Sequence, residues 1–410
     1  MPTDRHQSLD ALRGFAVMGI LLMNIIGFSM PMAAYVNPAA WGSANSMDNW
    51  AWAIAFVLID GKMRGLFSLL FGASMLLVVD RAEAKGEDPT RVHLRRMVWL
   101  LVFGLIHYCF IWAGDILALY ALCGAFALSL RALPARGLVW MGAAFMLLNL
   151  LLWGMTLLTV HDARFAAQSI GASAKAQAEF TAILADLGAS SGAGPRADVA
   201  LHLGSYSGIV SARLSEMMGG LIGQIFAYGP ETVGLMAWGM ALLKSGALTG
   251  NWTQARYLKM AAIAYAVGLP LSLLLVWAAT SSNFDPLMMA DIFYVGSLPP
   301  RMAMMIGHTM LLLWLIGQAK GVWLVRVAAA GRAAFSNYIA TSLVMTTLFY
   351  GYGLGLYGSL HRMTVYFLVP PVWFLMLLWS KPWLDRYHYG PLEWLWRSLA
   401  RGKRQPFNKG

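Results

Sequence analysis

Three charged side chains stand close together between two strongly apolar stretches of the sequence: Asp60, Lys62 and Arg64. A charge at the centre of a bilayer costs about 2.5–3.5 kcal/mol on insertion scales, so such residues usually face a bundle interior or a polar cavity. Asp60 and Arg64 can pair along one helix face, whereas Lys62 needs a partner elsewhere. These residues could hold a polar substrate or relay protons. The alternative is that Asp60 and Lys62 lie at headgroup level and extend their polar ends toward water.

A histidine and an aspartate add acid–base chemistry at a similar expected depth. His107 lies in the outer half of an apolar stretch, and Asp115 lies in the short turn before the next one. Either can take a proton from a reacting hydroxyl, so these two are the candidate catalytic residues. Capping of the helix that follows would explain Asp115 equally well. We expect His107, Asp115 and the charges at 60–64 to share one cavity that opens toward the external side of the membrane.

Four more polar residues are candidates for substrate contact: Arg13, Asn24, Glu231 and His308. Arg13 and Asn24 are about three helical turns apart, so they would line one stripe, with Asn24 roughly 16 Å deeper than Arg13. Snorkelling at the cytoplasmic interface would also explain Arg13. Glu231 follows a Gly-Pro pair typical of a helix start, where it could simply cap the helix. His308 lies near the middle of an apolar stretch, where a packing role is the simpler interpretation.

The composition shows which class of protein must position these residues. The chain has 410 residues, of which 59% are hydrophobic and 12% charged, against roughly 25% charged in soluble domains. Several apolar runs reach the roughly 17 residues that cross a bilayer core. These features predict an all-α, polytopic transmembrane bundle rather than a soluble protein or a membrane barrel. Cys109 and Cys123 both fall in predicted spans and offer neither a disulfide framework nor zinc spacing, so no metal site is expected.

About ten spans are predicted, and the charges between them set the orientation. The spans lie near 13–31, 62–79, 97–113, 116–131, 138–160, 231–243, 258–280, 301–318, 333–351 and 363–379. If the N-terminus is cytoplasmic, most of the 30 Lys and Arg residues fall on the cytoplasmic side, which predicts that both termini are cytoplasmic. The net charge of +11 then reflects membrane topology, and no nucleic-acid partner is expected. The first apolar run is interpreted as a retained helix rather than a cleaved signal.

The predicted spans and their orientation divide the chain into four segments. Residues 1–160 and 231–380 each form a five-span bundle, and 161–230 form an external segment between them. The external segment begins as an Ala-rich helix, continues as a flexible Gly/Ser-rich stretch and ends in an amphipathic helix at 210–229 on the external leaflet. Residues 381–410 form a basic cytoplasmic tail.

The tail is expected to contain an interfacial helix. Glu393 would pair with Arg397, and Trp394 and Trp396 would lie at the depth of the headgroups beside basic residues. Such a helix binds anionic lipid at the cytoplasmic surface. The alternative is a disordered basic end.

Five stretches of the sequence resemble the YeiB-like family of bacterial inner-membrane proteins, in the family's order and over almost the whole chain. They read SLDALRGFAVMGILLMNI, GKMRGLFSLLFGASM, GLIHYCFIWAGDILALYAL, GRAAFSNYIATSLVMTTLFYGYGLGLYG and GPLEWLWRSL. The resemblance implies a multi-pass protein of the bacterial inner membrane. It implies no settled activity, although transport has been suggested for the family.

The first stretch is also similar to the start of transmembrane acyltransferases. In the sugar O-acyltransferases an arginine is followed after ten residues by a histidine, but here the matching positions are Arg13 and Asn24. The heparan-glucosaminide acetyltransferase group carries asparagine there and places its catalytic histidine before a tryptophan soon after the first helix. In this sequence Ala39 and Ala40 precede Trp41. The architecture therefore favours acyl transfer, the expected base is missing, and His107 could substitute for it.

Three functions remain open from the sequence. The first is a membrane acyltransferase that takes a donor such as acyl-CoA near Arg13, Arg95 and Arg96 and carries it to a lipid or small polar acceptor. The second is a transporter or a lipid- or quinone-binding protein, with the charges at 60–64 and Asp115 as a relay. The third is a non-catalytic membrane partner. Membrane lipids, a small-molecule or lipid substrate and a second copy of the chain are the partners to test.

Overall fold

The computed structural model describes residues 3–43, 45–186, 193–319 and 321–409. Within these ranges the chain is built of helices and connecting turns, and its one β-type contact is the isolated bridge between Tyr387 and Asn408. A helix satisfies its own backbone hydrogen bonds, which is what an apolar chain requires in lipid. The prediction of an all-α protein is confirmed. Residues 187–192, part of the stretch predicted to be flexible, lie outside the described residues.

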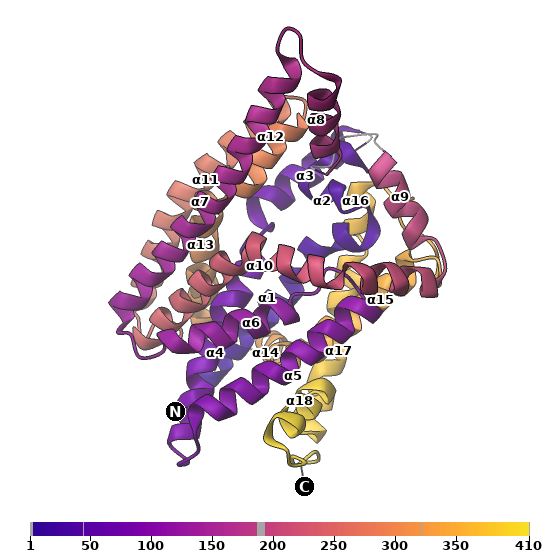
Figure 1. Cartoon of the computed structure of the whole chain (residues 1–410). Coiled ribbons are helices and arrows are strands. Elements are labelled where there is room, and N and C mark those ends of the chain that lie inside the picture. Colours follow the sequence, from indigo (N-terminus) through magenta and orange to yellow (C-terminus); the bar gives the residue numbers. More distant parts are fainter. Residues whose placement is uncertain (1–2, 44, 187–192, 320, 410) are drawn as a thin grey trace.

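The helices follow one another along the chain as labelled in Figure 1. The first seven are α1 (Thr3–Ser29), α2 (Ala33–Val36), α3 (Ser46–Leu58), α4 (Lys62–Glu83), α5 (Pro89–Phe110), α6 (Leu117–Ala127) and α7 (Ala135–Gln168). The next six are α8 (Ala174–Asp186), α9 (Ala193–His202), α10 (Tyr206–Lys244), α11 (Gln254–Ser281), α12 (Pro286–Ala290) and α13 (Leu298–Gln318). The last five are α14 (Val322–Arg332), α15 (Ala334–Phe349), α16 (Arg362–Tyr366), α17 (Val369–Arg386) and α18 (Pro391–Arg401).

Six helical segments of the described chain are long and apolar enough to cross a membrane, judged by length and composition. They are Ser8–Ser29, Ser46–Glu83, Ala135–Gln168, Gln254–Ser281, Leu298–Gln318 and Arg362–Arg386. Each contains or overlaps a predicted span. The other four predicted spans fall on α5, α6, the end of α10 and α15, which are not among the six. The chain is a membrane-type helical protein, and the count of ten spans stays a prediction.

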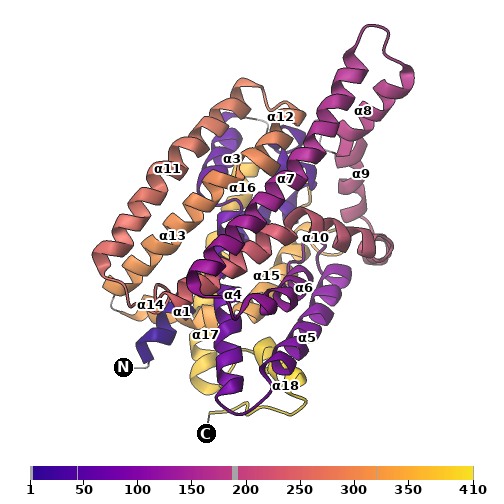
Figure 2. The same ribbon diagram turned by 60° about the vertical axis from the view of Figure 1, so that its left-hand side comes forward.

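The two ends of the chain lie at one end of the molecule, and the α7–α8 hairpin lies at the other (Figures 1 and 2). Helix α1 runs through the interior of the molecule. Of its most apolar 18-residue stretch 78% is buried, whereas only 17% of the corresponding stretch of α11 is buried. A helix that is apolar all round belongs inside a bundle, and α1 accordingly packs against α4, α14 and α15. Helix α11 packs along α13 and turns its other apolar side chains outward.

Helix α10 corrects one prediction about the external segment. The expected surface helix at 210–229 and the expected span at 231–243 form one continuous helix, which crosses the molecule in Figure 1. Pro230 lies inside this helix, where it removes one backbone hydrogen bond, rather than at its start. Packing along α7 and α4 holds the helix together across the proline. Gly72 and Gly239 allow the close approach of α4 and α10, because a Cβ on either would collide with the backbone of the other helix.

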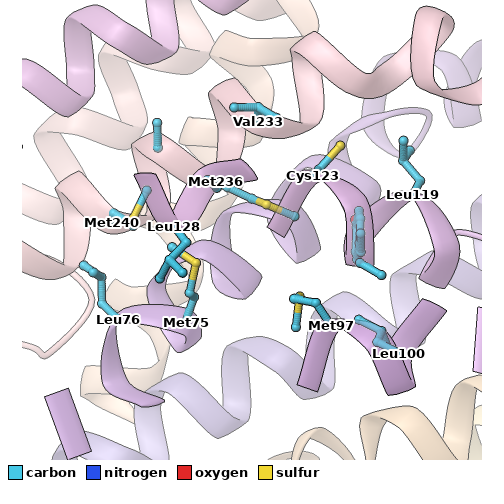
Figure 3. Packing of buried hydrophobic residues seen from close by; sticks show 14 of the residues in the cluster. Met75, Leu76, Met97, Leu100, Leu119, Cys123, Leu128, Val233, Met236 and Met240 are labelled. Carbon is cyan, nitrogen blue, oxygen red and sulfur yellow. The ribbon is translucent and has the colours of Figure 1, made fainter. Parts of the chain in front are cut away.

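A methionine-rich core joins α4, α5, α6 and α10 (Figure 3). It includes Met75, Met97, Cys123, Met236 and Met240, each at most 6% exposed. Methionine is flexible enough to fill the irregular space between crossing helices. This core fixes the relative positions of α4, α5 and α10, which carry Lys62, Arg64, His107 and Glu231, and of α6, which follows Asp115.

The tail contains a helix as predicted, α18, but two of its side chains make other contacts than expected. Glu393 does not pair with Arg397; it accepts hydrogen bonds from the backbone N–H of Phe335 (2.7 Å) and Ser336 (3.1 Å) and from the Ser336 hydroxyl (2.6 Å). It thereby caps the first turn of α15, whose N–H groups have no partner within the helix. The Trp396 indole donates to a backbone carbonyl of α5 at 2.9 Å. Trp396 therefore faces protein rather than lipid headgroups, and α18 is docked onto α5 and α15.

Candidate functional site

Five of the predicted site residues line one cavity of about 260 Å³, which we call the polar cavity: Asn24, Asp60, Lys62, Arg64 and Asp115. They come from α1, the turn before α4, α4 itself and the turn before α6. Arg301, from the start of α13, completes the charged part of the wall. The cost of an isolated charge at membrane depth explains why these residues gather.

The charges at 60–64 do not lie on one continuous helix. Helix α3 ends at Leu58, the chain turns at Gly61 with a φ of 71°, and α4 begins at Lys62. Glycine adopts this left-handed conformation without strain, and a Cβ here would also collide with the Arg301 side chain. The predicted Asp60–Arg64 pair along one helix face is therefore wrong. Within the described chain the Asp60 carboxylate has neither an ion pair nor a hydrogen bond, whereas the Lys62 ammonium donates to the Phe56 carbonyl.

Glu231 joins two arginines beneath the polar cavity. Its carboxylate accepts from Arg64 at 2.9 Å and from Arg301 at 2.8 Å, and the Glu231 side chain is 1% exposed. Glu231 is thus an ion-pair centre inside α10, not the cap of a helix start. Each arginine donates to the Glu231 carboxylate through its Nη2 group. The Nη1 of Arg64 and the Nε of Arg301 are buried and have no hydrogen-bond partner in the described chain.

His107 and Asp115 form a buried pair beside the polar cavity. The His107 Nδ1 and an Asp115 oxygen are 2.8 Å apart, and the second Asp115 oxygen accepts from the backbone N–H of Ala118 at 2.8 Å. Asp115 therefore caps α6 and orients the histidine at the same time. The His107 Nε2 has no hydrogen-bond partner in the described residues, and the rings of Trp112 and Tyr338 pack around the imidazole. The predicted contact of Asp115 with Lys62 or Arg64 is not an ion pair; the three only share the cavity.

A second cavity of about 340 Å³ approaches the same pair from the end of the molecule that carries the chain termini. We call it the arginine cavity, because its lining includes Arg13, Arg81, Arg96, Arg332 and Arg397. The rest of its lining is mostly apolar and aromatic and includes Tyr120 and Tyr338. Ile20 and Ile116 line both cavities.

The two arginines expected on the donor side differ in their surroundings. Arg96 lines the arginine cavity, and its guanidinium lies 4.3 Å from the centre of the Trp396 ring. Arg95 is exposed and does not line the cavity. Arg13 also lines it, with a salt bridge to Asp10 at 2.7 Å and a hydrogen bond to Ser74 at 2.6 Å.

Three residues fell outside the predicted arrangement. His107 lines neither cavity, and only its partner Asp115 lines the polar cavity, so the prediction that His107 shares this cavity is wrong. His308 lines neither cavity; it lies 2.8 Å from the Tyr265 hydroxyl and 2.7 Å from the Leu58 carbonyl, so packing explains it. Arg301 was not predicted, because an arginine at the end of an apolar stretch is usually explained by snorkelling. In the described chain no three His, Cys, Asp or Glu residues are grouped so that they could hold a metal ion.

Comparison with known proteins settles the family. Residues 242–403 match a family described as a protein of unknown function, DUF418. The chain is 30% identical to the uncharacterized protein YeiB of Escherichia coli (strain K12), over 97% of this chain and 96% of the relative. The chain belongs to the YeiB-like family. It is also 30% identical to the uncharacterized protein YxaH of Bacillus subtilis (strain 168), over 100% of this chain and 97% of that protein. No solved structure matches.

Membership of the YeiB-like family confirms the resemblance seen in the five sequence stretches. The names of these relatives state no activity. The activity therefore has to be argued from the two cavities and the residues between them.

Proposed function

We propose that the protein is a membrane acyltransferase in which His107, oriented by Asp115, is the general base. The observation that carries the proposal is the position of this pair between two cavities: Asp115 lines the polar cavity, and Tyr338, whose ring centre is 5.1 Å from that of His107, lines the arginine cavity. The donor would enter through the arginine cavity and the acceptor would occupy the polar cavity. A buried carboxylate that fixes the tautomer of a histidine is the arrangement that general-base catalysis requires.

The arginine cavity suits a donor with phosphate groups and an acyl chain, such as acyl-CoA. Arg81, Arg96, Arg332 and Arg397 have no carboxylate within salt-bridge distance in the described chain. Clustered like charges repel one another unless an anion lies among them, and arginine forms strong paired hydrogen bonds to phosphate. The apolar and aromatic part of the cavity lining would hold the acyl chain.

The transfer step balances without a further reactant. The acceptor hydroxyl attacks the thioester carbonyl, so that a carbon–oxygen bond forms and the carbon–sulfur bond breaks. The Nε2 of His107 takes the hydroxyl proton and then gives it to the departing thiolate. Because Nε2 is enclosed by the Trp112 and Tyr338 rings, one of these rings must turn aside as the substrates bind.

Orientation in the membrane is part of the proposal. The bias of basic residues favours cytoplasmic termini in the bacterial inner membrane. The termini lie at the end of the molecule reached by the arginine cavity. The donor would then come from the cytoplasm, where CoA thioesters are made.

Coenzyme A binding tests the donor site with two neighbouring arginines. Arg96→Gln is expected to weaken CoA binding by roughly 10- to 100-fold, because a hydrogen bond between charged groups contributes about 1.5–3 kcal/mol. Arg95→Gln makes the same charge change one residue away, on an exposed side chain outside the cavity, and should bind like the unaltered protein. Titration calorimetry in nanodiscs measures both. Equal loss in the two variants, or no CoA binding by the unaltered protein, would contradict the donor site.

A transporter is the second candidate, and one observation favours it. The two cavities share Ile20 and Ile116, so they approach each other closely without merging. Alternating access uses a site reached from opposite sides in turn. A transporter would move a labelled ligand across proteoliposomes and leave it chemically unchanged, whereas the acyltransferase would consume a thioester.

A further inference from the structure

We propose that the polar cavity binds its ligand through an anionic group, a phosphate or a carboxylate, held between Arg64 and Arg301. The inference rests on the proposed function in one respect only, the identification of this ligand as the acyl acceptor. The anion site itself rests on the ion-pair geometry beneath the cavity and would stand if the protein were not an enzyme.

The ion-pair group of Arg64, Arg301 and Glu231 carries one more positive than negative charge, although the carboxylates of Asp60 and Asp115 line the same cavity. Arg64 and Arg301 carry two positive charges, and the single carboxylate of Glu231 lies between them. All three residues are at most 8% exposed. A buried charge without a partner is costly, so one further anion would complete the group.

Hydrogen-bond donors are already present for that anion. Glu231 uses only the Nη2 group of each arginine, and the Nη1 of Arg64 and the Nε of Arg301 are buried without partners in the described chain. Both arginines line the cavity, whereas Glu231 does not. The guanidinium of Arg64 is further held in place by the Tyr228 ring, 4.6 Å away, which also lines the cavity. Rigid, desolvated guanidinium groups of this kind bind phosphate and carboxylate selectively.

The Asp60 carboxylate offers a second contact for the same ligand. Asp60 lines the cavity, and its carboxylate has no hydrogen bond or ion pair within the described chain. It can accept from a hydroxyl or an ammonium group of the ligand. A volume of about 260 Å³ admits a small molecule or a lipid headgroup of this chemistry.

Two single variants test the site while keeping a balanced ion pair. Arg301→Gln leaves Glu231 with Arg64, and Arg64→Gln leaves it with Arg301, so each variant should fold. We expect the dissociation constant for sn-glycerol 3-phosphate to rise at least ~10-fold in both, in line with the loss of one charged hydrogen-bond donor. The control is Arg164→Gln, which removes a half-buried charge outside the cavity, 3.6 Å from Asp285, and should leave the constant unchanged.

Binding is measured by thermal shift in nanodiscs of phosphatidylcholine, with no CoA compound present, and compared with nanodiscs that contain phosphatidylglycerol. A shift with glycerol 3-phosphate identifies a soluble ligand, and a shift with phosphatidylglycerol alone identifies a lipid headgroup; either supports the site if both arginine variants lose it. Equal shifts in all variants, or no shift with either probe in the unaltered protein, would overturn the inference. Failure of CoA binding with success here would refute the acyltransferase and leave the anion site in place.

Discussion

Glu231→Gln is expected to lower the free energy of unfolding by about 3–5 kcal/mol, the usual cost of removing one partner from a buried ion pair. Glu231 joins α10 to Arg64 on α4 and to Arg301 on α13, and its side chain is 1% exposed. Glutamine keeps the shape of the side chain but leaves two buried guanidinium groups without a counter-charge.

Unfolding of the purified protein in a detergent series measures this effect, and Glu216→Gln is the matched control because Glu216 is exposed on the same helix. The control should change stability by well under 1 kcal/mol, as exposed substitutions usually do. Phosphate added to Glu231→Gln should restore part of the lost stability, since the anion would occupy the vacated charge. Similar small effects in both variants would contradict the role assigned to Glu231.

His107→Gln is expected to slow acyl transfer by about 10²- to 10⁴-fold, the range that a positioned general base contributes. Asp115→Asn should also slow transfer strongly, because the asparagine oxygen can still cap α6 through the Ala118 N–H while the carboxylate that orients His107 is lost. The rate of acetyl-CoA cleavage, measured with saturating donor, measures the effect of both variants on acyl transfer.

His308→Gln is the control for this experiment. His308 is a partly buried histidine that contacts a tyrosine hydroxyl and a backbone carbonyl, whereas His107 contacts a carboxylate. Its variant should retain the rate of the unaltered protein. Full activity of His107→Gln, or an equal loss in His308→Gln, would show that His107 is not the base.

The grouping of Asn24, Asp60, Lys62 and Asp115 around one cavity could be predicted from the sequence. All four would raise the free energy of the folded protein if their polar groups faced lipid. A polar group at membrane depth must face a cavity or a partner, and positions at a similar depth can meet in the same one. The helical class could be predicted for a related reason: an apolar chain of this length satisfies its backbone in lipid only as helices or a closed barrel.

The ion-pair partners could not be predicted, because they depend on how distant helices cross. Pro230 is typical of a helix start, yet α10 continues on both sides of it and packs against α7 and α4. Glu231 therefore lies inside the helix and meets Arg64 and Arg301, which are 167 and 70 residues away in the sequence. Likewise, the four-residue spacing of Asp60 and Arg64 suggested a pair, but the left-handed Gly61 ends that continuity.

The fate of a labelled acetyl group tests the central claim most directly. The purified protein in nanodiscs is incubated with acetyl-labelled acetyl-CoA and an extract of bacterial envelope lipids and small polar molecules, and the products are separated by mass. The account predicts that label moves to an acceptor that carries a phosphate or carboxylate, with release of one free CoA thiol per transfer, and that His107→Gln abolishes both. Acetyl-CoA that stays intact in the presence of the full extract, or cleavage that His107→Gln leaves unchanged, would contradict it.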